Sequence, residues 1–301
     1  MLRTIAPQVA VVCCVVLAGC TSAGGRVAVP ADSGRLRVAV SFYPIEEIVD
    51  NVGGDQVEVI ELTPAGSEPH DLEMSPQTAA QLEQANVVFY LGHGFQPTVE
   101  KAIASLGGDV VKVDLLNSVE TIVEAGQVDP HIWLDPINMI AMTDDVASTL
   151  STAHADGSTR FQAHAAAYSR QLAALADEFS AKLAHCQSRT VVISHRSFAY
   201  LTTRMDLDQL AIVGISPDEE PAPKRLQAVA ESARRLGVST VFSEARVSDG
   251  LASTVADEID ATTAALDPIE SITSSELTAG ASYISLQRAN LAALVGGLRC
   301  G

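Results

Sequence analysis

Short runs of β-branched and other apolar residues alternate with helical patterns over most of this 301-residue chain. Each run is four to eight residues long, and the segments between most of the runs show helical spacing of their apolar residues. The eight predicted strands are residues 36–41, 56–62, 86–92, 109–116, 190–194, 209–215, 239–243 and 262–266. Alternation of strands with helices is typical of α/β domains with parallel sheets.

One long helical segment separates the first four predicted strands from the last four. Its apolar residues recur between Phe161 and Leu183 at intervals of seven, four, three, four and four, which places them on one face of a single helix over residues 160–186. Such a helix would be about 40 Å long. The pattern predicts two Rossmann-like α/β lobes with parallel sheets, joined by one long rigid helix. We expect an N-terminal lobe over residues 36–157, a linking helix over 158–187 and a C-terminal lobe over 188–301.

The first 35 residues have the features of an export signal and a tether. A single basic residue, Arg3, precedes an apolar stretch over residues 9–17, and LAGC at 17–20 resembles the lipobox of bacterial lipoproteins. The apolar stretch is short for a membrane span. We therefore expect a signal peptide over residues 1–19, cleavage before Cys20, lipidation of that thiol and a flexible tether over 20–35. The alternatives are an ordinary signal peptide and an uncleaved anchor.

Composition and charge exclude some classes of partner. The formal net charge is −18, so a nucleic-acid partner is not expected, because phosphate binding needs a basic surface. Hydrophobic residues make up 47% of the chain, as in a well-packed globular protein. Two cysteines, Cys186 and Cys300, remain beyond the signal and the lipidated thiol. In an exported chain they are expected to form a disulfide, with two separately buried thiols as the alternative.

Candidate metal ligands follow several of the predicted strands. His70 lies in the loop after the second strand, His195 follows the fifth strand directly, and Asp267 follows the eighth directly. His131 lies between two Asp-Pro pairs in DPHIWLDP, in a stiff loop after the last N-terminal strand. Ligands of open α/β sheets bind outside the carboxyl ends of the strands. These four residues are therefore expected to meet in one cleft between the lobes.

Three imidazoles and one carboxylate are a ligand set that suits Zn²⁺, whereas Mn²⁺ favours more oxygen ligands. Four protein ligands fill the coordination sphere, which favours holding a metal over catalysis at it. Glu244, after the seventh strand, is a rival fourth ligand, although an ordinary loop residue or a hydrogen-bond acceptor behind the ligands is the preferred interpretation. His93, in a Gly-rich turn, is interpreted as an exposed turn residue. The usual motifs of nucleotide-binding proteins and hydrolases do not occur in the sequence.

These motifs resemble those of a known family, the zinc- and manganese-binding receptors of bacterial ABC importers, also called cluster 9 solute-binding lipoproteins. EPHDLEMSP, DPHIWLDP, SHRSFAYLTTRMDL and the DP of ALDPIES resemble that family's four ligand motifs, in the same order, and GISPDEEPAPKRL and VFSEARVS resemble segments between the last two. The resemblance covers nearly all of the chain after the tether. It implies that His70, His131, His195 and Asp267 bind the metal between two lobes bridged by a long helix.

The resemblance also implies a function outside the cytoplasm. We expect a monomeric, lipid-anchored receptor on the outer face of the cell membrane that delivers Zn²⁺ to an ABC permease powered by a separate ATPase. A histidine at the third position is commoner in the zinc-type receptors. Residues 117–130 lack the histidine-rich loop of many zinc receptors, which leaves manganese open, and LGHGFQP at 91–97 departs from the family's usual segment. A metal-binding adhesin and a zinc-dependent hydrolase are the alternative functions.

We predict that Cys20→Ala leaves the precursor unlipidated and no longer tethered to the membrane. Partitioning of the expressed protein into a detergent phase measures the anchor. Partitioning of the variant at the level of the parent protein would contradict the lipobox interpretation.

Overall fold

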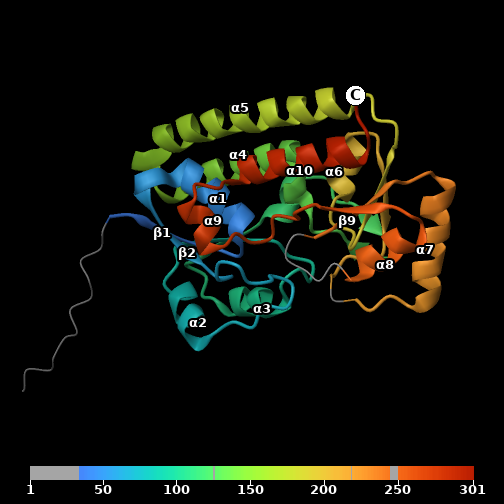
Figure 1. Ribbon diagram of the computed structural model, residues 1–301. Helices are drawn as coiled ribbons and strands as arrows, with labels where there is room; N and C mark the ends of the chain where they lie inside the picture. Colours follow the sequence, from blue (N-terminus) through green and yellow to red (C-terminus); the bar gives the residue numbers. More distant parts are fainter. Residues whose placement is uncertain (1–33, 125, 218, 245–249) are drawn as a thin grey trace, which may run out of the picture. The chain divides into compact units, whose positions relative to one another are not determined.

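Two four-stranded parallel sheets lie in the two halves of the chain, as the alternation of strands and helices predicts (Figure 1). The computed structural model describes residues 34–124, 126–217, 219–244 and 250–301. The predicted signal peptide, Cys20 and nearly all of the predicted tether lie outside the described residues. No helix in the described part of the chain is both long enough and apolar enough to cross a membrane.

The N-terminal sheet has the strand order β2-β1-β3-β4. Its strands and the helices that follow them are β1 (Leu36–Val40), α1 (Tyr43–Gly53), β2 (Val57–Glu61), α2 (Pro76–Leu82), β3 (Val87–Tyr90), α3 (Pro97–Ser105) and β4 (Val111–Asp114). All pairs are parallel, with Val38 in register with Val59 on one side and Val87 on the other. Because β1 lies between β2 and β3, the chain reverses direction across the sheet next to β1, where α/β proteins bind ligands.

The C-terminal sheet repeats this arrangement with the order β10-β9-β7-β8, again all parallel. Its elements are β7 (Thr190–Ile193), α6 (Ala199–Arg204), β8 (Asp208–Ala211), α7 (Pro223–Arg235), β9 (Thr240–Ser243), α8 (Gly250–Glu258), β10 (Thr262–Ala265), α9 (Ser274–Thr278) and α10 (Tyr283–Gly297). The central strands β7 and β9 are buried along their whole length. Every predicted strand therefore forms.

A layer of long helices covers both sheets on one side (Figure 1). The predicted long helix is α5 (Ser158–Leu183), and its buried face contains Phe161, Leu172 and Leu183 at the predicted spacing. It packs against α1 and α4 (Pro136–Ala153) of the N-terminal half and against α10 of the C-terminal half. One hydrophobic cluster runs through both halves. The long helix thus links the two halves and also belongs to the hydrophobic core that they share.

Proline and aspartate set the start of α4 as the sequence predicts. The side chain of Asp135 accepts a hydrogen bond from the backbone N–H of Ile137, and Pro136 occupies the first helical position, where its missing N–H costs nothing. Asp135 also pairs with Arg204 of α6, with Nε and Oδ2 2.5 Å apart. This cap fixes the end of the DPHIWLDP loop and joins it to the C-terminal half.

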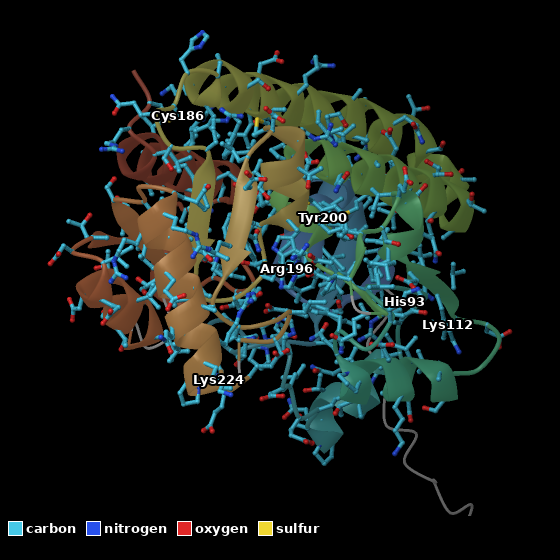
Figure 2. The ribbon with its side chains drawn as sticks, turned by 90° about the vertical axis from the view of Figure 1, so that its right-hand side faces the viewer. His93, Lys112, Cys186, Arg196, Tyr200 and Lys224 are labelled. Atoms are coloured by element: carbon cyan, nitrogen blue, oxygen red, sulfur yellow. A yellow bond between two sulfur atoms is a disulfide. The ribbon has the colours of Figure 1, made fainter. Side chains whose placement is uncertain are left out.

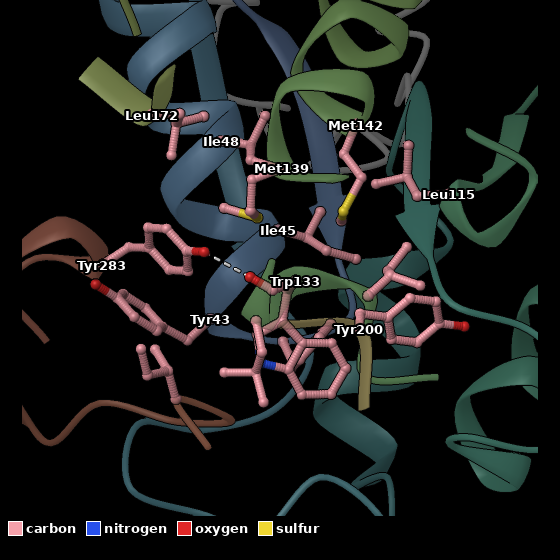
Figure 3. Packing of buried hydrophobic residues seen from close by; sticks show 14 of the residues in the cluster. Tyr43, Ile45, Ile48, Leu115, Trp133, Met139, Met142, Leu172, Tyr200 and Tyr283 are labelled. Atoms are coloured by element: carbon pink, nitrogen blue, oxygen red, sulfur yellow. Dashed lines mark hydrogen bonds between the residues drawn. The ribbon is translucent and has the colours of Figure 1, made fainter. Parts of the chain in front are cut away.

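Trp133 ties the DPHIWLDP loop to the last part of the chain. Its indole Nε1 donates to the carbonyl of Pro268 at 2.8 Å, and its own carbonyl accepts from the hydroxyl of Tyr283 at 2.6 Å (Figure 3). Gln287 donates to the carbonyl of Leu134 at 3.0 Å. These bonds are buried, so losing one would leave a polar group without a partner. They hold the N-terminal loop against the C-terminal segment that follows β10.

A short hairpin makes a further contact between the two halves. It consists of β5 (Val123–Glu124) and β6 (Gln127–Val128), in the segment where the sequence predicted only a loop. The hydroxyl of Tyr200 accepts from the backbone N–H of Ile122 at 2.9 Å and donates to the carbonyl of Asp129 at 2.7 Å. Arg196 forms an ion pair with Glu124. The hairpin is therefore held by residues that follow β7.

Cys186 and Cys300 form a disulfide between the residues just after α5 and the end of the chain (Figure 2). The backbone of the two cysteines also forms an isolated antiparallel bridge. The bond closes a loop of 114 residues that contains the whole C-terminal sheet. A cross-link across so long a loop removes much conformational entropy from the unfolded chain.

We predict that replacing both cysteines by serine in a chain of residues 35–301 lowers the free energy of unfolding by about 2–4 kcal/mol. Urea unfolding, followed by circular dichroism with and without reductant, measures the effect. Reductant should bring the parent protein to the stability of the double variant and leave the variant unchanged. Equal stability of all four samples would show that the bond does not stabilise the fold.

Candidate metal centre

Four side chains from both halves of the chain converge on one point. His70 comes from the loop between β2 and α2, and His131 precedes a 3-10 turn before α4. His195 lies two residues after β7, and Glu270 lies five residues after β10. One nitrogen or oxygen of each lies within 4.8 Å of all the others. His70, His195 and Glu270 follow the carboxyl ends of the parallel strands β2, β7 and β10, and His131 follows the hairpin of β5 and β6.

The Oε1 atom of Glu270 lies at similar distances from all three imidazoles of the cluster. It is 3.4 Å from Nε2 of His70, 3.5 Å from Nε2 of His131 and 3.6 Å from Nε2 of His195. Nε2 of His195 lies 3.2 Å from Nε2 of His131. His131 and His195 have no exposed surface, and Glu270 is 5% exposed. The cluster is therefore closed to bulk water on most sides.

Buried carboxylates set the orientation of two of the imidazoles. Nδ1 of His131 lies 2.8 Å from Oδ1 of Asp129, and Nδ1 of His195 lies 2.5 Å from Oε1 of Glu244. An ionised carboxylate can only accept, so each Nδ1 carries the hydrogen. In the neutral imidazoles the Nε2 lone pairs then point at each other across 3.2 Å. Two such lone pairs repel, and a proton or a cation between them removes the repulsion.

The same carboxylates raise the pKa of both imidazoles. Burial alone lowers the pKa of His195, but the hydrogen bond to Glu244 and the nearby carboxylate of Glu270 outweigh burial and raise it to about 10. Burial also lowers the pKa of His131, and the charge and hydrogen bond of Asp129 outweigh it, so this pKa is raised too. Burial raises the pKa of Glu270, but its contacts with the three histidines hold it well below its usual range. The cluster therefore favours one bound positive charge at its centre.

The dimensions and the unpartnered atoms of the cluster fit a tetrahedral zinc site. Zinc–nitrogen and zinc–oxygen bonds of ~2.0–2.2 Å place neighbouring ligand atoms about 3.4 Å apart. Four of the separations between ligand atoms are 3.2, 3.4, 3.5 and 3.6 Å. Nε2 of His70 and Oε1 of Glu270 are buried and lack a hydrogen-bond partner among the described residues. Buried polar atoms without partners are costly, and a bound cation would satisfy both.

The carboxylate of this cluster differs from the sequence prediction, which named Asp267. Oδ1 of Asp267 instead accepts from the backbone N–H of Ile269 at 2.8 Å, and Asn290 bonds the backbone of Asp267 on both sides. Asp267 thus stabilises a tight turn in which Ile269 has a φ of +53°. The turn carries Glu270 into the cluster. The signal in the sequence that could have identified this carboxylate is a glutamate, Glu270, three residues after Asp267.

The other residues singled out in the sequence lie around the cluster. Glu244 holds His195 and is not among the four converging side chains, in line with the preferred interpretation of the sequence. Trp133 packs beside His131, with ring centroids 5.1 Å apart. His93 is exposed, in a turn after β3. Sequence reasoning missed Asp129, although it immediately precedes the proline before His131 and was quoted in the same motif.

Two parallel-sheet lobes that enclose a buried site of three imidazoles and one carboxylate define a metal-binding protein of the two-lobed receptor class. The chain belongs to the ZnuA family, zinc-uptake complex component A, periplasmic, whose model matches residues 38–297. This confirms the resemblance that the sequence motifs indicated.

Named relatives and solved structures agree with this membership. The zinc-binding lipoprotein AdcA of Streptococcus pneumoniae serotype 4 is 31% identical over 277 residues, covering 87% of this chain and 55% of the relative. The Zn(II)-bound ZnuA-like domain of Streptococcus pneumoniae AdcA superposes with a TM-score of 0.77 at 30% identity, covering 88% of this chain and 99% of the domain. The chain therefore spans about half the length of the full AdcA protein.

A second similar solved structure has a different description. The laminin-binding protein Lmb of Streptococcus agalactiae, described as bifunctional with adhesin and metal-transporting activity, superposes with a TM-score of 0.80 at 27% identity. The similarity covers 87% of this chain and 99% of that one. The two-lobed fold is thus shared by relatives described as zinc-binding and as laminin-binding.

We predict that Glu244→Gln lowers the pKa of His195 in the metal-free protein from about 10 toward its ordinary value of ~6.5. The variant removes the carboxylate bonded to Nδ1, whereas burial, which lowers the pKa, and Glu270, which raises it, both remain. Because the parent pKa is raised, the stabilising effect of this proton is complete below about pH 6.5 and is lost as the pH rises toward 10. As the pH rises, the variant should therefore lose this stabilisation at a lower pH than the parent protein does.

Nuclear magnetic resonance titration of the imidazole signals, with the metal removed by a chelator, measures the pKa. Glu219→Gln, which changes an exposed carboxylate, is the control and should leave the titration of His195 unchanged. An unchanged His195 titration in Glu244→Gln would show that Glu244 does not set the charge of this imidazole.

Proposed function

We propose that this chain is the extracytoplasmic receptor of an ABC importer and that it captures Zn²⁺ for delivery to a membrane permease. The observation that supports this most is the convergence of three imidazole Nε2 atoms and one carboxylate oxygen at the spacing of a tetrahedral zinc site. Membership of the zinc-uptake family supports the same function. His70, His131, His195 and Glu270 are the proposed ligands, with Glu270 in place of Asp267.

The ligand set favours zinc over manganese. Three neutral imidazoles suit Zn²⁺, and Mn²⁺ favours sites with more oxygen ligands. Asp129 and Glu244 sit behind two of the imidazoles, fix their tautomers and raise their basicity as ligands. The name and the bound metal of the similar streptococcal structure point the same way. Manganese is the competing cargo that a binding experiment has to exclude.

The arrangement suits holding a metal and does not suit catalysis. Four protein ligands complete a tetrahedral sphere, whereas catalytic zinc sites keep one position for water. His131, His195 and Glu270 are also buried, so a substrate could approach a metal among them mainly from the side of His70. We therefore propose a binding protein and not an enzyme.

Proton exchange gives the site a means of release. With its pKa raised to about 10, His195 is protonated at neutral pH when no metal is bound. Zinc must displace this proton when it binds, because only the neutral imidazole is a ligand. When zinc leaves, a proton returns to His195 beside Glu244 and Glu270, and this offsets part of the free energy lost with the metal contacts.

The remaining parts of the proposal concern the cell surface. Cys20 would carry the lipid that holds the monomeric receptor at the outer face of the cell membrane, and a permease with a separate ATPase would be its partner. The laminin-binding relative makes an adhesin the second candidate. Loss of growth in zinc-depleted medium on deletion, with adhesion to laminin unchanged, would favour the transport receptor.

We predict that Glu270→Gln weakens zinc affinity by more than about 100-fold, because a neutral amide replaces the charged ligand of the proposed site. Competition titration with a chelating dye measures the affinity, and the same titration with Mn²⁺ tests the choice of metal. Asp267→Asn is the matched control. It keeps an acceptor oxygen for the N–H of Ile269, so its affinity should stay within about threefold of the parent protein.

The same variants test the function in cells. The parent gene and Asp267→Asn should restore growth of a deletion strain in zinc-depleted medium, and Glu270→Gln should not. A large loss of affinity in Asp267→Asn with none in Glu270→Gln would reverse the assignment of the fourth ligand. Absence of zinc binding by the parent protein would refute the proposed function.

A further inference from the structure

The buried cluster has an approach on the side of His70. A cavity of about 290 Å³ adjoins the site, and His70 is the one member of the four-residue cluster that lines it. The side chain of His70 is 8% exposed, whereas those of His131 and His195 are fully buried. A cation that enters through this cavity therefore meets His70 before the other imidazoles.

Two further residues with metal-binding groups line the same cavity. His93 comes from the loop after β3, and Glu219 comes from the segment between β8 and α7. The other described lining residues are glycines, apolar residues, a serine and a glutamine, none of which binds Zn²⁺ strongly. His93 and Glu219 are both exposed. The cavity thus has an imidazole and a carboxylate in contact with solvent, one from each lobe.

Hydrogen bonds hold the turn that carries His93, and a neighbouring residue of the same turn contacts His70. The N–H groups of Gly92 and Gly94 donate to Asp114 and Glu100, each at 3.0 Å. Phe95, two residues after His93, packs edge-on against the ring of His70 with centroids 4.8 Å apart. Figure 2 labels His93 in the N-terminal half of the molecule. The position of His93 is therefore coupled to that of the outermost cluster residue.

His93 occupies a backbone conformation that glycine adopts more easily. Its φ is +59°, in the left-handed region, and its neighbour Gly94 has a φ of +86°. Few residues with a side chain adopt this region without cost, although histidine, asparagine and aspartate are enriched there. The carboxylate of Glu219 is placed by a hydrogen bond from the N–H of Gly214 to Oε2, at 3.1 Å. Both side chains are thus positioned by the backbone around them.

We propose that His93 and Glu219 form an outer capture site that takes Zn²⁺ from solvent and passes it to His70. This inference rests on the proposed function as a zinc receptor. Two ligands hold a zinc ion weakly, so the ion exchanges quickly at such a site. The imidazole and the carboxylate replace part of the hydration shell of the ion before it reaches the buried ligands. The outer site speeds transfer without taking part in the final complex.

A residue that assists transfer and is absent from the final complex has a distinctive kinetic effect. Its removal leaves the dissociation constant unchanged, because the free energies of the empty and loaded protein do not depend on the route between them. The association and dissociation rates must then fall by the same factor. A purely structural role of the turn gives no such matched change.

The test measures both rates in the purified full chain. Stopped-flow mixing with ZnCl₂ follows association through the fluorescence of Trp133, the only tryptophan, whose ring lies 5.1 Å from that of His131. Mixing the loaded protein with a chelating dye follows dissociation. His93→Asn removes the imidazole and keeps a residue that tolerates a positive φ. We expect both rates to fall by about fivefold and the dissociation constant to stay within about twofold.

Matched controls separate this effect from loss of charge or of a surface histidine. Glu219→Gln should slow both rates as His93→Asn does, whereas Glu220→Gln, the neighbouring carboxylate outside this cavity, should not. His185→Asn removes an exposed histidine after α5 and should also leave the rates unchanged. His93→Gly should be as slow as His93→Asn, because both variants lack the imidazole.

Unchanged rates in both His93→Asn and Glu219→Gln would overturn the capture site and leave the proposed zinc receptor intact. Weaker equilibrium binding in His93→Asn, by tenfold or more, would also overturn it, because His93 would then belong to the final complex. Parental rates in His93→Gly would assign the effect to the backbone and would contradict the proposal. Failure of the parent chain to bind zinc would instead refute the proposed function itself.

Discussion

The central constraint in this structure is the close approach of two imidazole nitrogens that cannot bond to each other when neutral. Asp129 and Glu244 accept the Nδ1 hydrogens of His131 and His195, which turns both Nε2 lone pairs toward the same point, 3.2 Å apart. A cation at that point relieves the repulsion and contacts Glu270 as well. The same two carboxylates raise the pKa of the imidazoles, so a proton takes this role when no metal is bound.

The fold brings these groups together because both sheets end at the same cleft. His131 belongs to the N-terminal half, and His195 and Glu270 belong to the C-terminal half. Buried hydrogen bonds that join Trp133 to the Pro268 carbonyl and to the Tyr283 hydroxyl of α10 hold the halves in one register. The long helix α5 packs on helices of both halves, and a disulfide closes its far end. A site whose ligands come from two lobes needs such cross-links, since a shift of 1 Å would spoil metal geometry.

In the proposed receptor, the buried residues of the cluster and the exposed residues of the adjoining cavity have different roles. His131, His195 and Glu270 are buried, and four ligands would complete the coordination of the proposed metal, which favours retention. The approach through the cavity beside His70 has exposed groups that exchange with water. Retention and exchange are opposing demands on the proposed receptor, and our two proposed sites assign them to different residues.

Sequence alone determined the alternation of strands and helices, the long helix, the cap at Asp135 and the three histidines of the cluster. These features depend on local periodicity, on the restricted backbone of proline and on the rule that ligands follow parallel strands. The choice between Asp267 and Glu270 depended on a turn, because a positive φ at Ile269 reverses the local direction of the chain. Only the tertiary structure could show which carboxylate reached the histidine cluster and that Asp129 accepts the Nδ1 hydrogen of His131. The physical reason is that spacing along a chain says where a residue lies on its element, whereas the direction of a side chain in a loop is decided by contacts with residues far away in the sequence.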